Sequence, residues 1–219
     1  MLQSVRRELF NWRPGRLAVL NAIKSFADNQ HKLLKSIITL HCPDGIECDV
    51  TYGHGVFYKD LQRPRLRFDV EPKLEDVIKA DSQRLPVKTN SMKSIMFDPP
   101  FLTYVRDGRN HKEGQMILSR RFGGFWHYDE LATYYKNTLI EIQRVLQKTG
   151  VLIVKCQDVR YNHKLRPTHI FVHDVCKSVN LFLKDLFVLC RDTTLPFPAK
   201  GKQRHARIHH SYFLVFTNK

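Results

Sequence analysis

The sequence predicts an α/β fold in which helices cover both faces of a mostly parallel sheet. Short β-branched and apolar segments alternate along the chain with longer segments whose apolar residues recur every three or four positions. One segment, GVLIVKC at 150–156, is almost continuously apolar, which is typical of a central parallel strand. This alternation calls for a parallel sheet with helices on both sides.

The first half of the chain contributes two expected helices and three expected strands. Amphipathic spacing predicts helices at 15–27 and 31–40. Short apolar runs bounded by glycine-containing or polar turns predict strands at 45–52, 63–70 and 92–97. Each of these strands is followed by a turn that carries polar residues.

The second half adds two helices and three strands, at 128–147, 150–156, 167–183, 185–191 and 210–218. The first of these helices is closed near Gly150 and the second begins at Pro167, and both residue types are favoured at those helix ends. A polar, basic segment without a helical pattern joins the last two strands. That connection allows an antiparallel strand at the end of the sheet.

The chain is strongly basic. Its 219 residues include 36 Lys+Arg and 21 Asp+Glu, a formal net charge of +15. Such an excess favours a polyanionic partner, with a generally basic surface as the alternative. The length suits a single domain at 1–219, with 1–30 as an N-terminal helical extension and 102–127 and 192–210 as candidate substrate-binding loops.

The sequence lacks the features of membrane and metal-binding proteins. No apolar run approaches the ~20 residues that a membrane span needs, and the N-terminus does not resemble a signal peptide. We therefore expect a protein that is not secreted, has no membrane partner and is cytoplasmic, or acts wherever its nucleic acid resides. Cysteines and histidines are not at metal-ligand spacing, so no metal is expected.

A glycine turn follows the strand that ends near Asp49. Gly53 and Gly55 flank His54, and glycines at such a place let the backbone pass close to a ligand. By itself the pattern is weak, because an ordinary tight turn has the same residues. Neither the longer dinucleotide motif nor a phosphate loop occurs, which disfavours a dinucleotide or ATP.

Acidic residues follow the next expected strands. Asp69 and Glu71 end one segment, RFDVEP, and Asp81 begins another, ADSQRLP. A carboxylate at a strand end is suited to accept hydrogen bonds from ribose hydroxyls. A single acid of this kind is equally compatible with solvated surface. Three successive strand ends that carry acids, at Asp49, at Asp69 and Glu71, and at Asp81, together with the glycine turn indicate a ligand site along the carboxyl edge of the sheet.

The segment SIMFDPPFLTY, at 94–104, carries the most specific motif. Asp98-Pro99-Pro100-Phe101 resembles the (D/N/S)-P-P-(Y/F/W) signature of amino methyltransferases, which methylate exocyclic base nitrogens with S-adenosylmethionine. The segments at 30–55, 67–72 and 80–86 and the helix and strand at 126–158 resemble other parts of that family in matching order. Val50-Thr51 replaces the usual Pro-Phe of the glycine-turn motif.

The resemblance implies a Rossmann-like class I methyltransferase fold with a mostly parallel seven-stranded sheet, and S-adenosyl-L-methionine as cofactor. It assigns the catalytic role to Asp98, Pro99, Pro100 and Phe101. It assigns cofactor binding to Lys32, Asp49, Thr51, Tyr52, Gly53, Gly55, Asp69, Glu71, Asp81, Ser82 and Asp98.

The expected function is that of a site-specific, adenine-specific DNA methyltransferase acting on N6. Alternatives are an RNA N6-adenine or an N4-cytosine methyltransferase, or a non-catalytic nucleic-acid-binding subunit of the same fold. A monomer or homodimer is expected, and because no target-recognition domain follows, a partner subunit is a further alternative. The phosphate contacts are assigned to Arg106, Arg109, Arg120, Arg121, Lys200, Lys202, Arg204 and Arg207.

Overall fold

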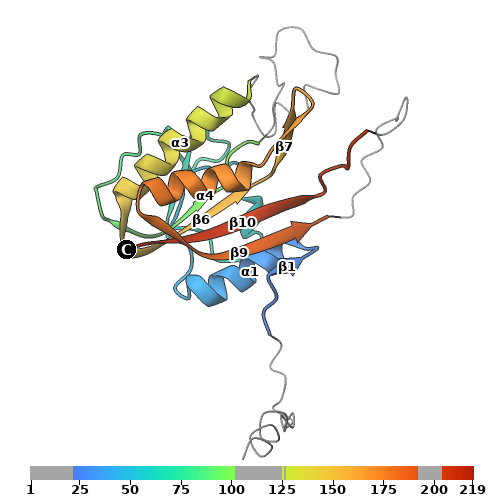
Figure 1. Ribbon diagram of the computed structural model, residues 1–219. Coiled ribbons are helices and arrows are strands. Elements are labelled where there is room, and N and C mark those ends of the chain that lie inside the picture. The colour runs from blue at the N-terminus through green and yellow to red at the C-terminus, as the bar shows by residue number, and fades with distance from the viewer. Residues whose placement is uncertain (1–21, 102–124, 126, 192–203) are drawn as a thin grey trace, which may run out of the picture.

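The computed structural model describes residues 22–101, 125, 127–191 and 204–219 (Figure 1). The described helices are α1 (Gln30–His41), α3 (Tyr128–Val145) and α4 (Thr168–Ser178), with a 3-10 turn, η1 (Val56–Tyr58). The strands are β1 (Phe26–Ala27), β2 (Cys48–Asp49), β3 (Leu66–Asp69), β4 (Ile78–Lys79), β5 (Met92–Phe97), β6 (Leu146–Cys156), β7 (Val159–Tyr161), β8 (Lys164–Arg166), β9 (Leu181–Cys190) and β10 (His210–Asn218).

Eight of the described strands form one sheet in the order β1-β9-β10-β6-β5-β2-β3-β4, and β7 and β8 form a separate hairpin. Strand β10 is antiparallel to both of its neighbours, whereas the other neighbouring pairs are parallel. The expected α/β fold, a mostly parallel sheet with helices on both faces, is thus confirmed. The sheet has one strand more than the seven expected, because β1 adds to the outer edge of β9.

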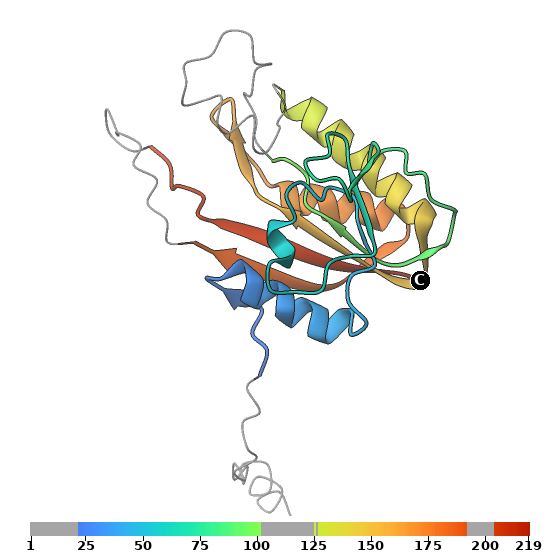
Figure 2. The same ribbon diagram turned by 180° about the vertical axis from the view of Figure 1, so that it is seen from behind.

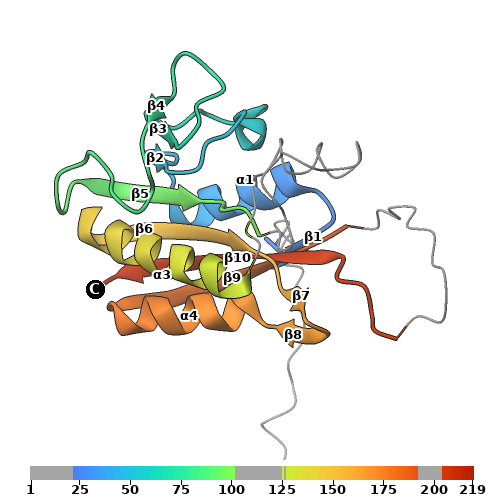
Figure 3. The ribbon, with the colours of Figure 1, turned by 90° about the horizontal axis from the view of Figure 1, so that it is seen from above.

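Two apolar cores lie on opposite faces of the sheet. Met96 and Ile153 pack with α1 in one core, whereas Phe97 and Val154 pack with α3 and α4 in the other. Successive residues of a strand point to opposite faces, so the apolar runs at 95–97 in β5 and 151–154 in β6 serve both cores. Figure 3 shows α1 on one side of the sheet and α3 and α4 on the other, and Figure 2 shows α1 and η1 from behind.

Side-chain caps fix the starts of two helices where the sequence pattern begins. Asn29 precedes α1 and its side-chain oxygen accepts a hydrogen bond from the backbone N–H of Lys32 at 3.0 Å. His127 and Glu130 form a capping box at the start of α3. The expected helices at 31–40 and 128–147 are confirmed, although the second ends at Val145.

The prediction of a helix at 15–27 is wrong for residues 22–27, the part of this range that the structure describes. Phe26 and Ala27 form β1, which pairs in parallel with Val188 and Leu189 of β9. Residues 15–21 lie outside the described part of the chain. The edge of β9 offers backbone partners to this segment, and such long-range pairing overrides a local helical pattern.

The expected helix at 167–183 is also too long. Helix α4 ends at Ser178, and Asn180 has a φ of 61°, in the left-handed region that often ends a helix. The chain then enters β9 at Leu181, earlier than the expected strand at 185–191. Residues 181–183 are part of β9 and not of the helix, because they pair with the long strand β10.

The last strand is antiparallel as the connection allowed, but it does not lie at the end of the sheet. Strand β10 lies between β6 and β9, and pairs with both along most of its length. The sequence pattern did not predict four of the described elements: η1, β4, β7 and β8. Each is only two or three residues long, which is too short to show a periodic pattern. Among the described helices, none has the length and apolar character of a membrane span.

Candidate active site

Three acidic residues follow neighbouring parallel strands at the same edge of the sheet. Asp49 ends β2 and Asp69 ends β3, while Asp98 directly follows β5. The register aligns Asp49 with Met96 on β5, so Asp98 lies just beyond the end of β2. Carboxyl ends of strands in open α/β sheets form ligand sites, and the order of these strands reverses between β2 and β5.

Hydrogen bonds join the glycine turn to these strand ends. The Asp49 carboxylate accepts from the Thr51 N–H at 2.9 Å, and the Asp69 carboxylate accepts from the Gly53 N–H at 2.8 Å. Gly53 and Gly55 have φ values of 55° and 66°, a conformation that glycine adopts without strain. The turn that sequence reasoning singled out is therefore a fixed part of the carboxyl edge.

Asp98 is held in place through its backbone while part of its carboxylate stays unbonded. Its N–H donates to the Thr51 hydroxyl at 2.8 Å. The Lys155 ammonium lies 3.3 Å from Oδ1 and 3.5 Å from Oδ2. Oδ1 is buried and has no hydrogen-bond partner among the described residues. Burial raises the pKa of Asp98, and the nearby Lys155 opposes that rise.

The remainder of the DPPF motif extends from this point. Pro99 is buried, and Pro100 and Phe101 are half-buried. Two successive prolines fix φ and stiffen the segment that follows Asp98. The Phe101 ring lies 5.8 Å from the Lys155 ammonium, so the motif's aromatic residue and its acid face the same cation.

Asp49 is the most deeply buried of the three acids. Only 1% of its surface is exposed, and the Tyr58 hydroxyl donates to its carboxylate at 2.7 Å. Burial raises the pKa of Asp49 to about 7, against the opposing effect of the hydrogen bonds from Thr51 and Tyr58. The negative charges of Asp98 and Asp69 raise it further, so Asp49 carries a proton in the folded protein below neutral pH.

This burial predicts a pH-dependent stability. The folded pKa of Asp49 lies above its unfolded value of roughly 3.9, so its ionisation destabilises the fold as pH rises through that interval. We expect the free energy of unfolding to fall between pH 5 and pH 8 by about 2–3 kcal/mol more in the parent than in Asp49→Asn. Urea unfolding of both proteins at the two pH values measures the difference, and equal pH dependence would contradict it.

Several sequence-predicted cofactor residues lie outside the hydrogen-bonded group of Asp49, Thr51, Gly53, Asp69 and Asp98. Lys32 is exposed at the start of α1, and Asp81 is exposed in a turn where it accepts from Gln83. Ser82 is buried, and its hydroxyl is engaged with the hydroxyls of Tyr134 and Thr138 on α3.

The functional groups of the other two predicted residues, Glu71 and Tyr52, are bonded to neighbouring side chains. The Glu71 N–H donates to Asp69 at 2.8 Å, while its exposed carboxylate pairs with Lys73. The buried ring of Tyr52 stacks on Tyr58, and its hydroxyl accepts from Arg63. The structure therefore gives Tyr52 a packing role beneath the turn.

Most of the predicted phosphate contacts lie outside the described residues: Arg106, Arg109, Arg120, Arg121, Lys200 and Lys202. Arg204 and Arg207 are described and exposed, in the segment that leads into β10. A feature that sequence reasoning missed is the β7–β8 hairpin beyond the carboxyl end of β6 (Figure 3), which carries Arg160, Lys164 and Arg166.

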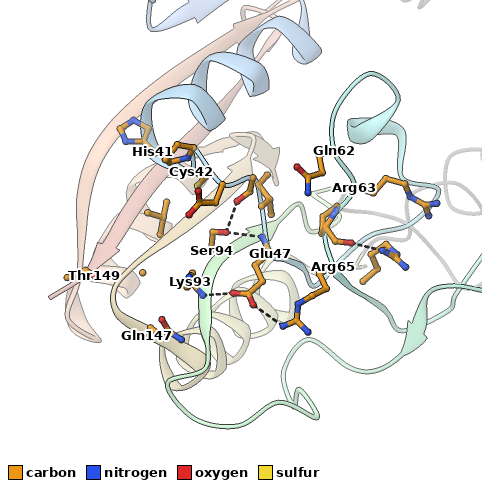
Figure 4. Close-up of a pocket in the computed structure, with 18 of the residues that line it drawn as sticks. His41, Cys42, Glu47, Gln62, Arg63, Arg65, Lys93, Ser94, Gln147 and Thr149 are labelled. Atoms are coloured by element: carbon orange, nitrogen blue, oxygen red, sulfur yellow. Dashed lines mark hydrogen bonds and ion pairs between the residues drawn. The ribbon is translucent and has the colours of Figure 1, made fainter.

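A surface pocket of about 750 Å³ lies at the opposite edge of the sheet (Figure 4). It is lined by residues that precede β2 and β3 and that begin β5 and β6. Its central acid, Glu47, is already bonded to the Arg65 guanidinium at 2.9 Å and to the Lys93 N–H at 2.8 Å. None of the acids at the carboxyl edge lines this pocket, so we do not place the chemistry there.

Within the described ranges, no group of three or more His, Cys, Asp or Glu side chains is arranged to hold a metal ion.

The chain is similar to several solved structures at low sequence identity. No protein-family model and no curated protein matches the chain. A proposed DNA modification methylase from Thermus thermophilus is 15% identical over 70% of this chain and 54% of that chain, with a TM-score of 0.44. A cytosine-N4-specific PvuII DNA methyltransferase is 14% identical over 63% and 47%, with a TM-score of 0.44. The chain spans about half the length of these two structures.

A third solved structure matches over nearly its whole length. This S-adenosylmethionine-dependent methyltransferase from Methanosarcina mazei is 10% identical over 83% of this chain and 96% of that chain, with a TM-score of 0.47.

Proposed function

We propose that the protein is an S-adenosylmethionine-dependent methyltransferase that methylates the exocyclic N6 of adenine in DNA. The observation that carries the proposal is the buried Oδ1 of Asp98, an acceptor that lacks a hydrogen-bond donor among the described residues. Buried polar atoms are nearly always bonded, and exceptions call for an explanation. A ligand with an N–H group at this position supplies one.

The residues around Asp98 suit an exocyclic amine. Such an amine is a poor nucleophile because its lone pair is delocalised into the base ring. Two acceptors aimed at its hydrogens, the Asp98 carboxylate and the Pro99 carbonyl, favour a tetrahedral nitrogen and stabilise the positive charge that develops on it. The stiff diproline keeps both acceptors in place, and Phe101 offers a face on which a base stacks.

The cofactor supplies an electrophilic methyl group. The space beside Gly53 is open, because a Cβ there would meet no atom within 4 Å, so a ligand can approach the backbone of the turn. Asp69 is the candidate for the ribose hydroxyls, since each of its oxygens accepts only one backbone N–H and retains acceptor capacity. These residues orient the cofactor, and Asp98 acts on the amine.

A base within a duplex cannot reach a strand-end pocket, so the target is flipped out or is single-stranded. Asp as the first residue of the motif is the reason for preferring adenine, and the strongly basic chain is the reason for a nucleic acid. An RNA or N4-cytosine substrate uses the same acceptors. A non-catalytic binding subunit leaves the unbonded Oδ1 without an explanation.

The decisive experiment is incubation with labelled S-adenosylmethionine and with duplex DNA, single-stranded DNA or RNA, followed by nucleoside mass spectrometry. N6-methyldeoxyadenosine is the expected product. N4-methylcytosine or methylated RNA would move the assignment to the corresponding alternative. Normal nucleic-acid binding without any methylation would favour the binding subunit.

Binding to nucleic acid should weaken steeply as salt rises. The slope of log affinity against log salt is proportional to the number of phosphates that the protein neutralises. Exchanging both Arg204 and Arg207 for Gln should reduce the magnitude of the slope by about 1 for each phosphate that is no longer neutralised. The control is Lys35→Gln with Lys177→Gln, which removes two exposed charges from α1 and α4. Equal slopes in the two double variants would show that Arg204 and Arg207 are ordinary surface residues.

A further inference from the structure

One lysine interrupts the apolar run of the central strand β6. The side chain of Lys155 is only 12% exposed, and its ammonium lies 3.3 and 3.5 Å from the two carboxylate oxygens of Asp98. Phe97 of β5 pairs with Val154 of β6 in the sheet register. Asp98 and Lys155 each follow one of these paired residues, so they are neighbours across the two segments. A lysine beside a carboxylate at this depth is uncommon, because long cationic side chains normally reach for water.

Three aromatic rings hold the ammonium. Its nitrogen lies 4.9 Å from the ring centroid of Phe57, 5.8 Å from that of Phe101 and 5.9 Å from that of Phe213. These rings come from η1, from the DPPF motif and from β10 respectively. Cations over aromatic faces are attracted by the ring quadrupole, and more strongly where water is excluded. The cation is therefore fixed by parts of the chain that are distant in sequence.

The ion pair neutralises Asp98 without filling its hydrogen-bonding capacity. Charge-assisted N–H···O bonds have typical lengths of about 2.7–2.9 Å, and both separations here are longer. Oδ1 has no hydrogen-bond partner among the described residues although Lys155 is its nearest cation. The electrostatic attraction at this separation is substantial in a poorly hydrated site, while the acceptor stays available.

We propose that Lys155 is a positioning residue that keeps Asp98 ionised and fixed in direction while leaving Oδ1 free to accept the target amine. The inference rests on the proposed amino methyltransferase function. An apolar side chain in place of Lys155 leaves a partly buried carboxylate, with Oδ1 fully buried, without its nearest cation, and this favours uptake of a proton. A protonated Asp98 is a weaker acceptor for a nitrogen that becomes positive.

Other charged and titratable groups around Asp98 do not replace this lysine. Arg191, after β9, attracts the carboxylate less strongly than Lys155 does. Asp49, on β2, carries a like charge when ionised, and it interacts unfavourably with Asp98. Tyr135 on α3 and Cys156 on β6 are buried, and the charge of Asp98 contributes to raising the pKa of each.

The test compares Lys155→Met with Lys155→Arg. Removing an opposite charge within ~4–6 Å typically moves a carboxyl pKa by 1–3 units. We therefore expect the acidic limb of the kcat–pH profile to move up by at least one pH unit in Lys155→Met, with KM for nucleic acid within about twofold of the parent. Lys155→Arg should restore the parental limb. A parental limb in Lys155→Met would overturn the proposal.

A second measurement does not depend on methylation. The Asp98 carboxyl resonance, assigned in ¹³C-aspartate-labelled protein by its loss in Asp98→Asn, should titrate at least one pH unit higher in Lys155→Met than in the parent. Lys93→Met, which removes an exposed lysine from the opposite end of β5, should leave that midpoint unchanged. If Lys155→Met does not fold, Lys155→Gln takes its place.

The two failures are distinguishable. An unshifted midpoint in a folded neutral variant overturns the role of Lys155, whatever the enzyme methylates. A shifted midpoint in a protein that methylates no nucleic acid supports the pairing of Lys155 with Asp98 and overturns the proposed function.

Discussion

Asp98→Ala should lower the turnover number for methyl transfer by two to three orders of magnitude. Loss of one preorganised polar partner in a water-excluded site typically raises the barrier by roughly 2.7–4 kcal/mol. The substitution removes the acceptor but retains the backbone N–H that donates to Thr51, so the segment keeps its anchor. Single-turnover kinetics with saturating nucleic acid and S-adenosylmethionine measure the change.

Affinity for the cofactor should change little in the same variant. The Gly53 N–H is bonded to Asp69, and that hydrogen bond does not involve Asp98. Glu75→Ala, which removes an exposed acid from the loop before β4, is the matched control and should keep the parental turnover. Parental turnover in a folded Asp98→Ala protein would show that the carboxylate does not act on the amine.

Gly55→Ala should be far more damaging than Gly53→Ala, although both glycines have positive φ. A Cβ at Gly55 would lie 2.5 Å from the Tyr52 hydroxyl oxygen, whereas one at Gly53 meets nothing within 4 Å. The Tyr52 ring is buried and cannot give way easily, because it stacks on Tyr58. We expect a loss of roughly 1 kcal/mol at Gly53 from backbone strain, and of about 2–4 kcal/mol at Gly55 from strain and overpacking together.

Comparing Gly53→Ala with Gly55→Ala also separates an effect on cofactor binding from an effect on protein stability. Urea unfolding gives the two losses, and calorimetry with S-adenosylmethionine gives the affinities. A displaced turn in Gly55→Ala should weaken cofactor binding at least tenfold under conditions where the protein remains folded. Gly53→Ala should also weaken binding, because its methyl group enters the open space beside the turn, but with the smaller loss of stability. Equal losses in stability would contradict the close packing of Gly55 on Tyr52.

The fold was largely predictable because its central strands and long helices carry strong local patterns. Residues 92–97 and 150–156 are apolar on both faces, and 128–147 repeats its apolar residues with helical spacing. Short edge elements have no such pattern. Phe26 and Ala27 form a strand only because β9 offers them backbone partners, which no window of local sequence contains.

The residues of the candidate site were predictable in two cases. In the first, a turn requires glycine, and in the second, a residue belongs to a recognisable sequence motif. The glycines at 53 and 55 and the acids at 49, 69 and 98 come together as the strand ends implied. Lys155 was not found, because a single lysine in a strand gives no sign of which way it points. The signal was present as the one charge within an otherwise apolar run, and it becomes informative only once β5 and β6 are known to be neighbours.

The position of β10 has a consequence for the order in which the sheet assembles. Strand β10 follows every other described element along the chain, yet it lies between β6 and β9 and pairs with both. During synthesis, β6 and β9 each keep an unpaired edge until residues 210–218 have emerged from the ribosome. Such pairing between distant segments is slow, and exposed edges invite association with other chains. Completion of the sheet thus depends on the last of its described strands to be made, which makes this half of the protein reliant on pairing between segments that are far apart along the chain.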